Sequence, residues 1–296
     1  MRSGFVAILG RPNAGKSTLI NALIKEKIAI TSYKAETTRN TISGILNRED
    51  LQIVFLDTPG IHEAKTVLGS YMNREALSQA EGVDVIYYIC DARNGLHEED
   101  DRILKKIKDK APVFLLLNKI DALSKEELLS RTTYAATHYD FAEIIPISAL
   151  KEENLEELLK TTLPYLQDGV LYYPQDQNTS ATMDFRIAEI IREKILICCE
   201  KEVPHLTAVF VERMKETEKR MNIEAVIVCG KESHKGIIIG QKGKMLQKIN
   251  SLASREIAEW LGKKVNLSLF VRVEEDWLNK SRRLFDLGYM TGNDEG

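Results

Sequence analysis

The chain has 296 residues, 44% of them hydrophobic and 29% charged, and a formal net charge of −3. This composition is typical of a soluble globular protein with room for one large domain or two ordinary ones. It excludes a membrane-spanning class, because no apolar run approaches the roughly 18 residues that a spanning helix needs.

The four cysteines and the start of the chain indicate a compartment. Each cysteine lies in an apolar run and none forms a CxxC pair, which predicts buried thiols in a reducing cytoplasm and argues against a zinc site. The N-terminus begins directly on a predicted strand, without the pattern of a signal peptide. We therefore expect a cytoplasmic protein, and loose contact with a membrane surface stays open.

Residues 1–170 alternate apolar strands with amphipathic helices. This alternation predicts an α/β domain with a mostly parallel sheet and helices on both faces. We expect strands at 5–9, 51–56, 84–90, 113–117 and 144–147. We expect helices at 16–26, 69–81, 98–109, 124–138 and 152–164.

A stretch rich in Pro, Gly, Asp, Gln, Asn and Ser then predicts a linker at 171–182. A smaller α+β domain is expected at 183–290, before a tail at 291–296. Its predicted helices are 184–202, 244–261 and 275–287, and its predicted strands are 206–214, 222–229 and 265–273.

The second part is basic, with 20 Lys and Arg against 16 Asp and Glu over residues 181–290. The first part is weakly acidic, so a polyanion would bind the second part. Ordinary surface variation is the alternative, because the excess is modest.

Residues 10–17 read GRPNAGKS and match the phosphate-binding pattern GxxxxGK[ST] between a strand and a helix. Backbone N–H groups of such a loop cradle phosphate oxygens. Lys16 would reach the β- and γ-phosphates, and Ser17 would ligate Mg²⁺. The motif leaves ATP and GTP open. The residues expected to hold the nucleotide here are Gly10, Arg11, Pro12, Asn13, Ala14, Gly15, Lys16, Ser17 and Thr18.

Residues 57–60 read DTPG and follow the predicted strand 51–56. An Asp at this strand end, Asp57, is expected to hold Mg²⁺ beside the phosphate loop. Gly60 has no side chain, so its N–H can approach a γ-phosphate closely. Thr58 and Pro59 are counted in the same site. The segment after Gly60 then has a reason to move on hydrolysis.

Residues 118–121 read NKID, and this motif selects the base. The Asp121 carboxylate can accept two hydrogen bonds from guanine, whereas adenine would leave this buried charge unpaired at a cost of several kcal/mol. Lys119 would lay its stem along the base, and Asn118 would tie the loops together. Ser148 and Ala149 are the expected last base contact, through backbone N–H to guanine O6.

Residues 33–40 are polar, lack periodicity and lie between the phosphate loop and DTPG. Thr38, favoured over Thr37, could complete Mg²⁺ coordination when a γ-phosphate is present. The predicted metal ligands are therefore Ser17, Thr38 and Asp57. A passive surface loop is the alternative.

Together these elements resemble the translation-factor-related GTPases, which hydrolyse GTP to GDP and phosphate. Many small GTPases place a water-orienting Gln directly after DxxG, but here Ile61 can neither donate nor accept a hydrogen bond. Hydrolysis is therefore expected to be slow, or to use another group or ion. Asn13 either binds K⁺ beside the phosphates or only braces the loop. The resulting set of predicted catalytic residues is Lys16, Thr38, Gly60 and Asn13.

Residues 234–244 read HKGIIIGQKGK, a Gly-x-x-Gly between an apolar strand and a helix, which is the signature of a KH domain. Its glycines let the backbone approach four nucleotides, nearby lysines supply a phosphate footprint, and the isoleucines would line a groove for bases. A helix N-terminus with solvated lysines is the alternative. The predicted RNA-binding residues are Lys235, Ile238, Gly240, Gln241, Lys242, Gly243 and Lys244.

A P-loop GTPase domain followed by a type II KH domain resembles the Era family of bacterial GTPases over residues 3 to about 290, through GRPNAGKS, ETTRN, DTPG, NKID, ISA and GIIIGQKG. The resemblance implies binding near the 3′ end of 16S rRNA, help in assembling the 30S subunit, and hydrolysis stimulated by RNA. It also implies that part of the protein lies peripherally at the inner face of the cell membrane. We expect a monomer.

The motifs favour a timer in which GTP and Mg²⁺ order residues 31–41 and 60–70 and thereby expose the KH groove. Two other readings stay open. One is a GTPase acting on another RNA, such as a modification GTPase, and the other is an RNA-binding adaptor with a regulatory GTP site.

Overall fold

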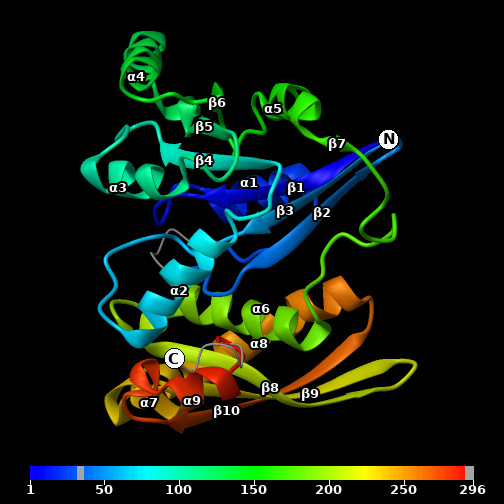
Figure 1. Ribbon diagram of the computed structural model, residues 1–296. Helices are drawn as coiled ribbons and strands as arrows, with labels where there is room; N and C mark the ends of the chain where they lie inside the picture. The colour runs from blue at the N-terminus through cyan, green and yellow to red at the C-terminus, as the bar shows by residue number, and fades with distance from the viewer. Residues whose placement is uncertain (32–36, 291–296) are drawn as a thin grey trace. The chain divides into compact units, whose positions relative to one another are not determined.

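Two β-sheets organise the chain, one in each of two units (Figure 1). The structure is a computed structural model that describes residues 1–31 and 37–290. The first unit comprises Met1–Lys65 and Gly69–Ser180, and the second comprises Thr66–Leu68 together with the chain from Ala181 onward. The predicted tail at 291–296 lies outside the described residues, as do residues 32–36 of the polar segment after the phosphate loop.

The sheet of the first unit has the strand order β2-β3-β1-β4-β5-β6, with a short β7 beside β1. Strand β2 is antiparallel to β3 and β7 is antiparallel to β1, whereas the remaining pairs are parallel. The strands are β1 (Arg2–Leu9), β2 (Ile42–Arg48), β3 (Leu51–Asp57), β4 (Val85–Asp91), β5 (Val113–Asn118), β6 (Glu143–Ile147) and β7 (Gln167–Asp168).

The central strands are buried on both faces, as their unbroken apolar runs predicted. Because β1, β3, β4, β5 and β6 are parallel, their carboxyl ends meet at one edge of the sheet, where ligands bind in open α/β folds. Helices connect the strands: α1 (Lys16–Ile24), α2 (Val67–Ser78), α3 (Glu98–Ile107), α4 (Lys125–His138) and α5 (Leu155–Thr162), with 3₁₀ turns η1 (Ile120–Ala122) and η2 (Leu163–Tyr165). The mostly parallel α/β fold expected from the sequence is confirmed.

Strand β2 was not predicted, because Gly44 and Asn47 interrupt its apolar pattern. The fold requires the glycine: a Cβ at Gly44 would lie 2.8 Å from the Ile20 side chain on α1. Gly44 allows close packing of α1 on the sheet, but it also breaks the apolar pattern from which β2 could have been predicted.

The linker expected at 171–182 lies against the first unit as far as Ser180, and we call residues 172–179 the strap. The buried side chain of Gln52 accepts from the backbone N–H of Tyr172 at 2.7 Å and donates to the carbonyl of Tyr173 at 2.8 Å. Farther along, the N–H of Ile45 donates to the carbonyl of Asn178 at 2.8 Å, and Thr179 forms a bridge with Gly44. The strap thus extends the edge of β2.

The second unit is a three-stranded sheet of order β10-β9-β8, with β10 parallel and β8 antiparallel to β9. Helices α6 and α8 pack on it around an apolar core that includes Ile187, Ile227 and Ile257. Its elements are α6 (Met183–Cys198), η3 (Val203–Leu206), β8 (Thr207–Glu216), β9 (Arg220–Cys229), α7 (Glu232–Ile239), η4 (Gln241–Gly243), α8 (Lys244–Leu261), β10 (Lys264–Val273), η5 (Trp277–Asn279) and α9 (Ser281–Asp286).

One expectation for this unit is wrong. The isoleucines before the Gly-x-x-Gly loop form helix α7, not a strand. A three-residue apolar run cannot by its periodicity distinguish a buried strand from a helix. The loop therefore joins two helices, α7 and α8.

Candidate functional site

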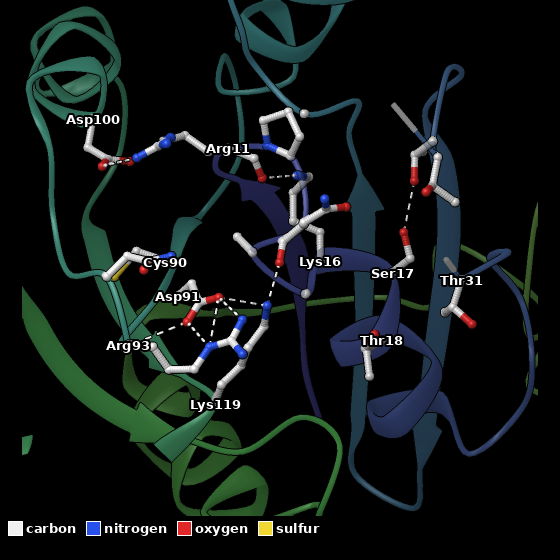
Figure 2. A pocket seen from close by; sticks show the side chains of 18 of the residues that line it. Arg11, Lys16, Ser17, Thr18, Thr31, Cys90, Asp91, Arg93, Asp100 and Lys119 are labelled. Carbon is white, nitrogen blue, oxygen red and sulfur yellow. Dashed lines mark hydrogen bonds and ion pairs between the residues drawn. The ribbon is translucent and has the colours of Figure 1, made fainter. Parts of the chain in front are cut away.

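The phosphate loop connects β1 to α1 at the carboxyl edge of the first sheet (Figure 2). Gly15 adopts φ 107°, and a Cβ there would lie 2.2 Å from the Asn118 amide nitrogen. Asn13 has φ 62°, a left-handed conformation that Asn tolerates better than most residues. Asn13 and Gly15 therefore occupy positions where the loop needs a positive φ. The loop leads directly into the start of α1.

Lys16 is enclosed by the loop that carries it. Its ammonium donates to the carbonyls of Gly10 at 3.1 Å and Arg11 at 2.9 Å. Burial lowers the Lys16 pKa to about 8, although the nearby Asp57 carboxylate opposes that shift. A phosphate entering the loop would bring negative charge to this ammonium and replace the neutral carbonyls as its partner.

The three predicted metal ligands come together. The Ser17 hydroxyl donates to Asp57 Oδ2 at 2.9 Å and lies 2.8 Å from the Thr38 hydroxyl, which itself lies 3.4 Å from Asp57 Oδ2. Burial raises the Asp57 pKa to about 6, against the opposing effect of Lys16. Its second oxygen, Oδ1, is buried and has no hydrogen-bond partner among the described residues. Hydroxyl and carboxylate oxygens are the ligands that Mg²⁺ prefers, so these residues fit the ion.

The DTPG segment packs on the phosphate loop. A Cβ at Gly60 would lie 2.8 Å from the backbone nitrogen of Pro12, and the N–H of Ile61 donates to the Gly10 carbonyl at 3.3 Å. Gly60 thus lies directly against the phosphate loop, and the approach of its N–H to a γ-phosphate stays a prediction. Thr58 is placed differently from the expectation: its buried hydroxyl donates to the Ile8 carbonyl at 2.7 Å, so it holds β3 to β1 and does not line the cavity.

Asn118 ties three segments together, as predicted. Its amide donates to the Ala14 carbonyl at 2.8 Å and its oxygen accepts from the N–H of Ala149 at 2.9 Å. Beside it, the Ser148 hydroxyl donates to Asp121 Oδ1 at 2.5 Å. The NKID motif and the Ser-Ala pair therefore form one corner at the ends of β5 and β6, which we call the base-binding corner after the predicted role of these residues.

The expected contact from Ser148 and Ala149 to guanine O6 stays a prediction, and it would require their N–H groups to exchange partners. The N–H of Ser148 donates to the Glu153 carbonyl at 3.2 Å, and the N–H of Ala149 is taken by Asn118. In the structure these two residues shape the corner and orient Asp121, and their N–H groups are engaged within the protein.

A cavity of about 690 Å³ lies over the phosphate loop and reaches Lys119, whereas Asn118, Asp121, Ser148 and Ala149 do not line it. Its lining includes the predicted Asn13, Lys16, Ser17, Thr38 and Lys119. It also includes residues that the sequence analysis missed, at the end of β4 and the start of α3: Cys90, Asp91, Arg93, Asn94, Gly95 and Asp100.

A usable signal for Asp91 was present in the sequence. Asp91 closes a buried strand in the same way as Asp57 and Asn118, and parallel strands bring such residues to one edge. Asp100 had no such signal. It lies within α3, where it is 2% exposed, accepts from the Tyr88 hydroxyl at 2.6 Å and lies 3.4 Å from Arg11 Nη1. That network holds the phosphate loop against α3 (Figure 2).

The Gly-x-x-Gly loop of the second unit turns tightly between α7 and α8. Gly240 adopts φ 70° and Gly243 adopts φ 78°, and a Cβ at Gly240 would lie 2.6 Å from Cβ of Met245. Between them, Gln241 and Lys242 are exposed. The loop therefore presents backbone and two polar side chains at the start of an 18-residue helix.

Five lysines surround this loop, and all are at least partly exposed: Lys231, Lys235, Lys242, Lys244 and Lys248. Among the residues that the structure describes, none of these ammonium groups pairs with a carboxylate. Phosphate groups are natural partners for such a cluster.

The prediction that Ile238 lines a groove for bases is wrong for its side chain. Ile238 is 0% exposed and belongs to the core of the second unit. The neighbouring Ile237, 47% exposed, is the isoleucine of α7 that reaches the surface most fully. Because α7 is a helix, only one of three consecutive isoleucines can point fully outward.

Comparison with known proteins assigns a family to each of the two units. Residues 5–119 match a family described as "50S ribosome-binding GTPase", and residues 202–278 match the KH domain. GTPase Era of Clostridium kluyveri is 46% identical over 291 residues, covering 98% of this chain and 99% of its own. The chain belongs to the Era family of GTPases.

Solved structures of Era share the whole fold. Era in complex with MgGDPNP and nucleotides 1506–1542 of 16S ribosomal RNA is 39% identical and covers 98% of this chain and 100% of its own, with a TM-score of 0.95. A substituted Aquifex aeolicus Era bound to GDP·AlF4⁻ gives the same identity, coverage and TM-score. The likeness therefore extends over both units of this Era-family GTPase. None of its described helices is long and apolar enough to cross a membrane.

Proposed function

We propose that this chain is a GTP-hydrolysing switch that binds 16S rRNA near its 3′ end through the KH domain and assists assembly of the 30S subunit. The observation that carries the proposal is the likeness, over 98% of the chain, to Era bound to both MgGDPNP and a 16S rRNA fragment. The convergence of Ser17, Thr38 and Asp57 at 2.8–3.4 Å supports a nucleotide-state sensor. The exposed lysines around residues 240–243 support an RNA contact.

In the nucleotide site, Ser17, Thr38 and Asp57 would hold Mg²⁺, which supplies charge neutralisation on the phosphates when bound. Lys16 would move from the loop carbonyls to the β- and γ-phosphates. The N–H of Gly60 would report the γ-phosphate, because no side chain separates it from the loop. Asp121, oriented by Ser148, would accept the guanine N1–H and amino group.

The rate of hydrolysis is expected to be low without RNA, because Ile61 replaces a water-orienting side chain. Asn13 lines the cavity, and its side chain makes no hydrogen bond within the described residues. Its amide oxygen can therefore ligate K⁺ beside the phosphates. We expect faster turnover in K⁺ than in Na⁺ at equal ionic strength, and equal turnover in the two salts would leave Asn13 only its left-handed backbone role.

The small-subunit target is preferred over the large subunit for a specific reason. The family description that names the 50S subunit rests on residues 5–119 alone, which contain no part of the KH domain. The relative with 16S rRNA resembles the chain over both units. The unit that contacts RNA determines which RNA is bound. The relative that resembles both units is therefore the better guide to the RNA target.

We further propose that the protein is a cytoplasmic monomer that contacts the inner face of the cell membrane peripherally. In the timer that we infer, GTP and Mg²⁺ act on the described residues 37–41 and 60–70, the KH domain binds RNA, and hydrolysis weakens that binding.

The decisive experiment measures binding of an oligonucleotide from the 3′ end of 16S rRNA, once with a non-hydrolysable GTP analogue and once with GDP. The control carries Gln241→Asp and Lys242→Asp, two exposed positions of the loop. Tight binding with the GTP analogue alone, lost in the control, is expected. Equal binding in both nucleotide states would overturn the timer, and no preference for this RNA would overturn the small-subunit target.

A further inference from the structure

A compact charged cluster lies at the carboxyl end of β4, beside the base-binding corner (Figure 2). Asp91 Oδ2 accepts from the Lys119 ammonium at 2.8 Å. Arg93 donates to the same carboxylate in a bidentate manner, through Nε to Oδ1 at 2.9 Å and Nη2 to Oδ2 at 2.6 Å. One carboxylate thus serves two cations, and its side chain is only 14% exposed.

The Lys119 ammonium is pinned from a second side. It also donates to the backbone carbonyl of Asn13 at 2.7 Å, in the phosphate loop. Lys119 itself has φ 71°, so its backbone conformation is unusual for a residue with a long side chain. Its head is therefore fixed between the end of β4 and the phosphate loop, and Lys119 lines the cavity.

Fixing this stem has a clear physical value. A lysine side chain loses much rotamer entropy on being ordered. A planar base that packs on a mobile stem must bear that cost on binding, whereas a stem already fixed by two acceptors does not impose it. The acceptor must also stay charged. Burial alone would raise the Asp91 pKa, but the hydrogen bonds from Arg93 and Lys119 outweigh burial and lower it to about 2.

We propose that Asp91, braced by Arg93, is a positioning residue of the nucleotide site: it holds the Lys119 ammonium against the phosphate loop so that the lysine stem forms a preformed wall for the guanine base. The proposal rests on the guanine site proposed above. Asp91 acts through Lys119 and does not touch the reacting phosphates.

The test measures dissociation of fluorescent mant-GDP from the full chain by stopped flow, for the wild type, Asp91→Asn, Lys119→Met and the double variant. Asparagine keeps the shape of the side chain and removes its charge. Loss of a charge-assisted hydrogen bond corresponds to about a tenfold faster dissociation. The double variant is expected to be no faster than Lys119→Met, because Asp91 then has no lysine to hold.

Two further readouts separate positioning from general stability. Asp91→Asn is expected to raise KM for GTP while leaving kcat within about twofold, since only binding of the base is impaired. The matched control is Asp84→Asn, which lies just before β4 at its opposite end and accepts from the N–H of Phe5 at 2.7 Å. If loosening of β4 were the cause, this control would also release mant-GDP faster.

The outcomes are distinct. The proposal is overturned if Asp91→Asn leaves the dissociation rate within twofold, if its effect persists undiminished in the Lys119→Met background, or if Asp84→Asn has the same effect. Failure of the wild type to prefer mant-GDP over mant-ADP would overturn the guanine site itself and, with it, the assignment of Asp91. A wild type that prefers guanine, with an unaffected Asp91→Asn, would overturn the role of Asp91 alone.

Discussion

Burial of charge dominates the nucleotide site at the scale of single residues. Lys16 and Asp57 are 6% and 0% exposed. Burial favours the neutral form of each group, so it lowers the pKa of Lys16 to about 8 and raises the pKa of Asp57 to about 6. A buried charge costs stability unless it is well paired. The nucleotide-free protein therefore holds Lys16 and Asp57 in place at the expense of folding free energy.

The substitution Asp57→Asn is expected to stabilise the nucleotide-free protein at pH 7.5. The folded-state pKa of Asp57 lies above its usual value of 3.8, so the folded protein binds this proton more tightly than the unfolded chain. Its contribution to stability therefore falls as the pH rises from about 4 through about 6, and the shift corresponds to about 3 kcal/mol when fully developed.

Urea unfolding at pH 5 and pH 7.5 checks this prediction, with the exposed Asp50→Asn as control. The stability gap between Asp57→Asn and wild type should be larger at pH 7.5 than at pH 5. A gap of equal size at both pH values would show that ionisation of Asp57 is not its cause. Binding of GTP with Mg²⁺ should be weakened in the same variant.

At the scale of elements, tight turns and strand edges do the positioning. The loop at 240–243 reverses the chain between α7 and α8 through positive φ at Gly240, Lys242 and Gly243. The strap on β2 depends on Gln52, which is 0% exposed and contacts the backbone of residues 172 and 173. In both places one or two residues fix the path of an entire segment.

Replacing Gly240 by Ala should destabilise the second unit and lower RNA affinity. The new Cβ would lie 2.6 Å from Met245 at a φ of 70°, so the start of α8 must shift. A cost of about 1–3 kcal/mol is expected for such strain. Gly230→Ala is the matched control, because no atom lies within 4 Å of the Cβ that it would add. Thermal unfolding compares the two, and equal melting temperatures would contradict the argument.

Replacing Gln52 by Ala should release the strap. The variant leaves the N–H groups of Tyr172 and Tyr173 and the carbonyl of Tyr173 without their buried partner, at a cost of about 1–3 kcal/mol. Limited proteolysis should then cut within residues 172–179 faster than in the wild type. Gln247→Ala, on the exposed face of α8, should leave the cleavage rate unchanged. Unchanged cleavage in both variants would mean that other contacts hold the strap.

At the scale of the whole molecule, the chain combines a nucleotide-dependent unit with an RNA-binding unit. If the nucleotide state changes RNA affinity, linkage requires RNA to change nucleotide affinity by the same factor. This reciprocity holds whatever the path of coupling between the units.

We expect the 16S rRNA oligonucleotide to bind about tenfold or more tightly in the state with the GTP analogue than in the state with GDP, a coupling within the usual range. Saturating RNA should then raise the affinity for the analogue, relative to GDP, by the same factor. Isothermal titration calorimetry measures the two ratios, once with RNA titrated into each nucleotide state and once with each nucleotide titrated into the protein with and without RNA. Both ratios should fall to unity in the Gln241→Asp and Lys242→Asp control, and unequal ratios in the native chain would contradict a simple two-state switch.

Much of the fold and of the candidate site could be predicted from the sequence, because the residues of each motif lie in one short segment. The spacing of GRPNAGKS, DTPG, NKID and GxxG predicts which backbone turns and which side chains are placed to meet phosphate, base or RNA. Unbroken apolar runs gave the five parallel strands to within a few residues. Such features depend on neighbours in the chain and on the common direction of parallel strands, so they can be predicted from the sequence.

The tertiary structure decided what depends on partners far apart in the chain. Asp91 meets Lys119 only because β4 and β5 are adjacent, Ile238 is buried only because α7 is a helix, and Gln52 captures residues 172 and 173 across the sheet edge. The N–H groups of Ser148 and Ala149 likewise donate to Glu153 and Asn118, and the spacing of the motifs did not predict these partners. Local motifs state which chemistry is available, but burial and long-range pairing determine which atoms remain to perform it.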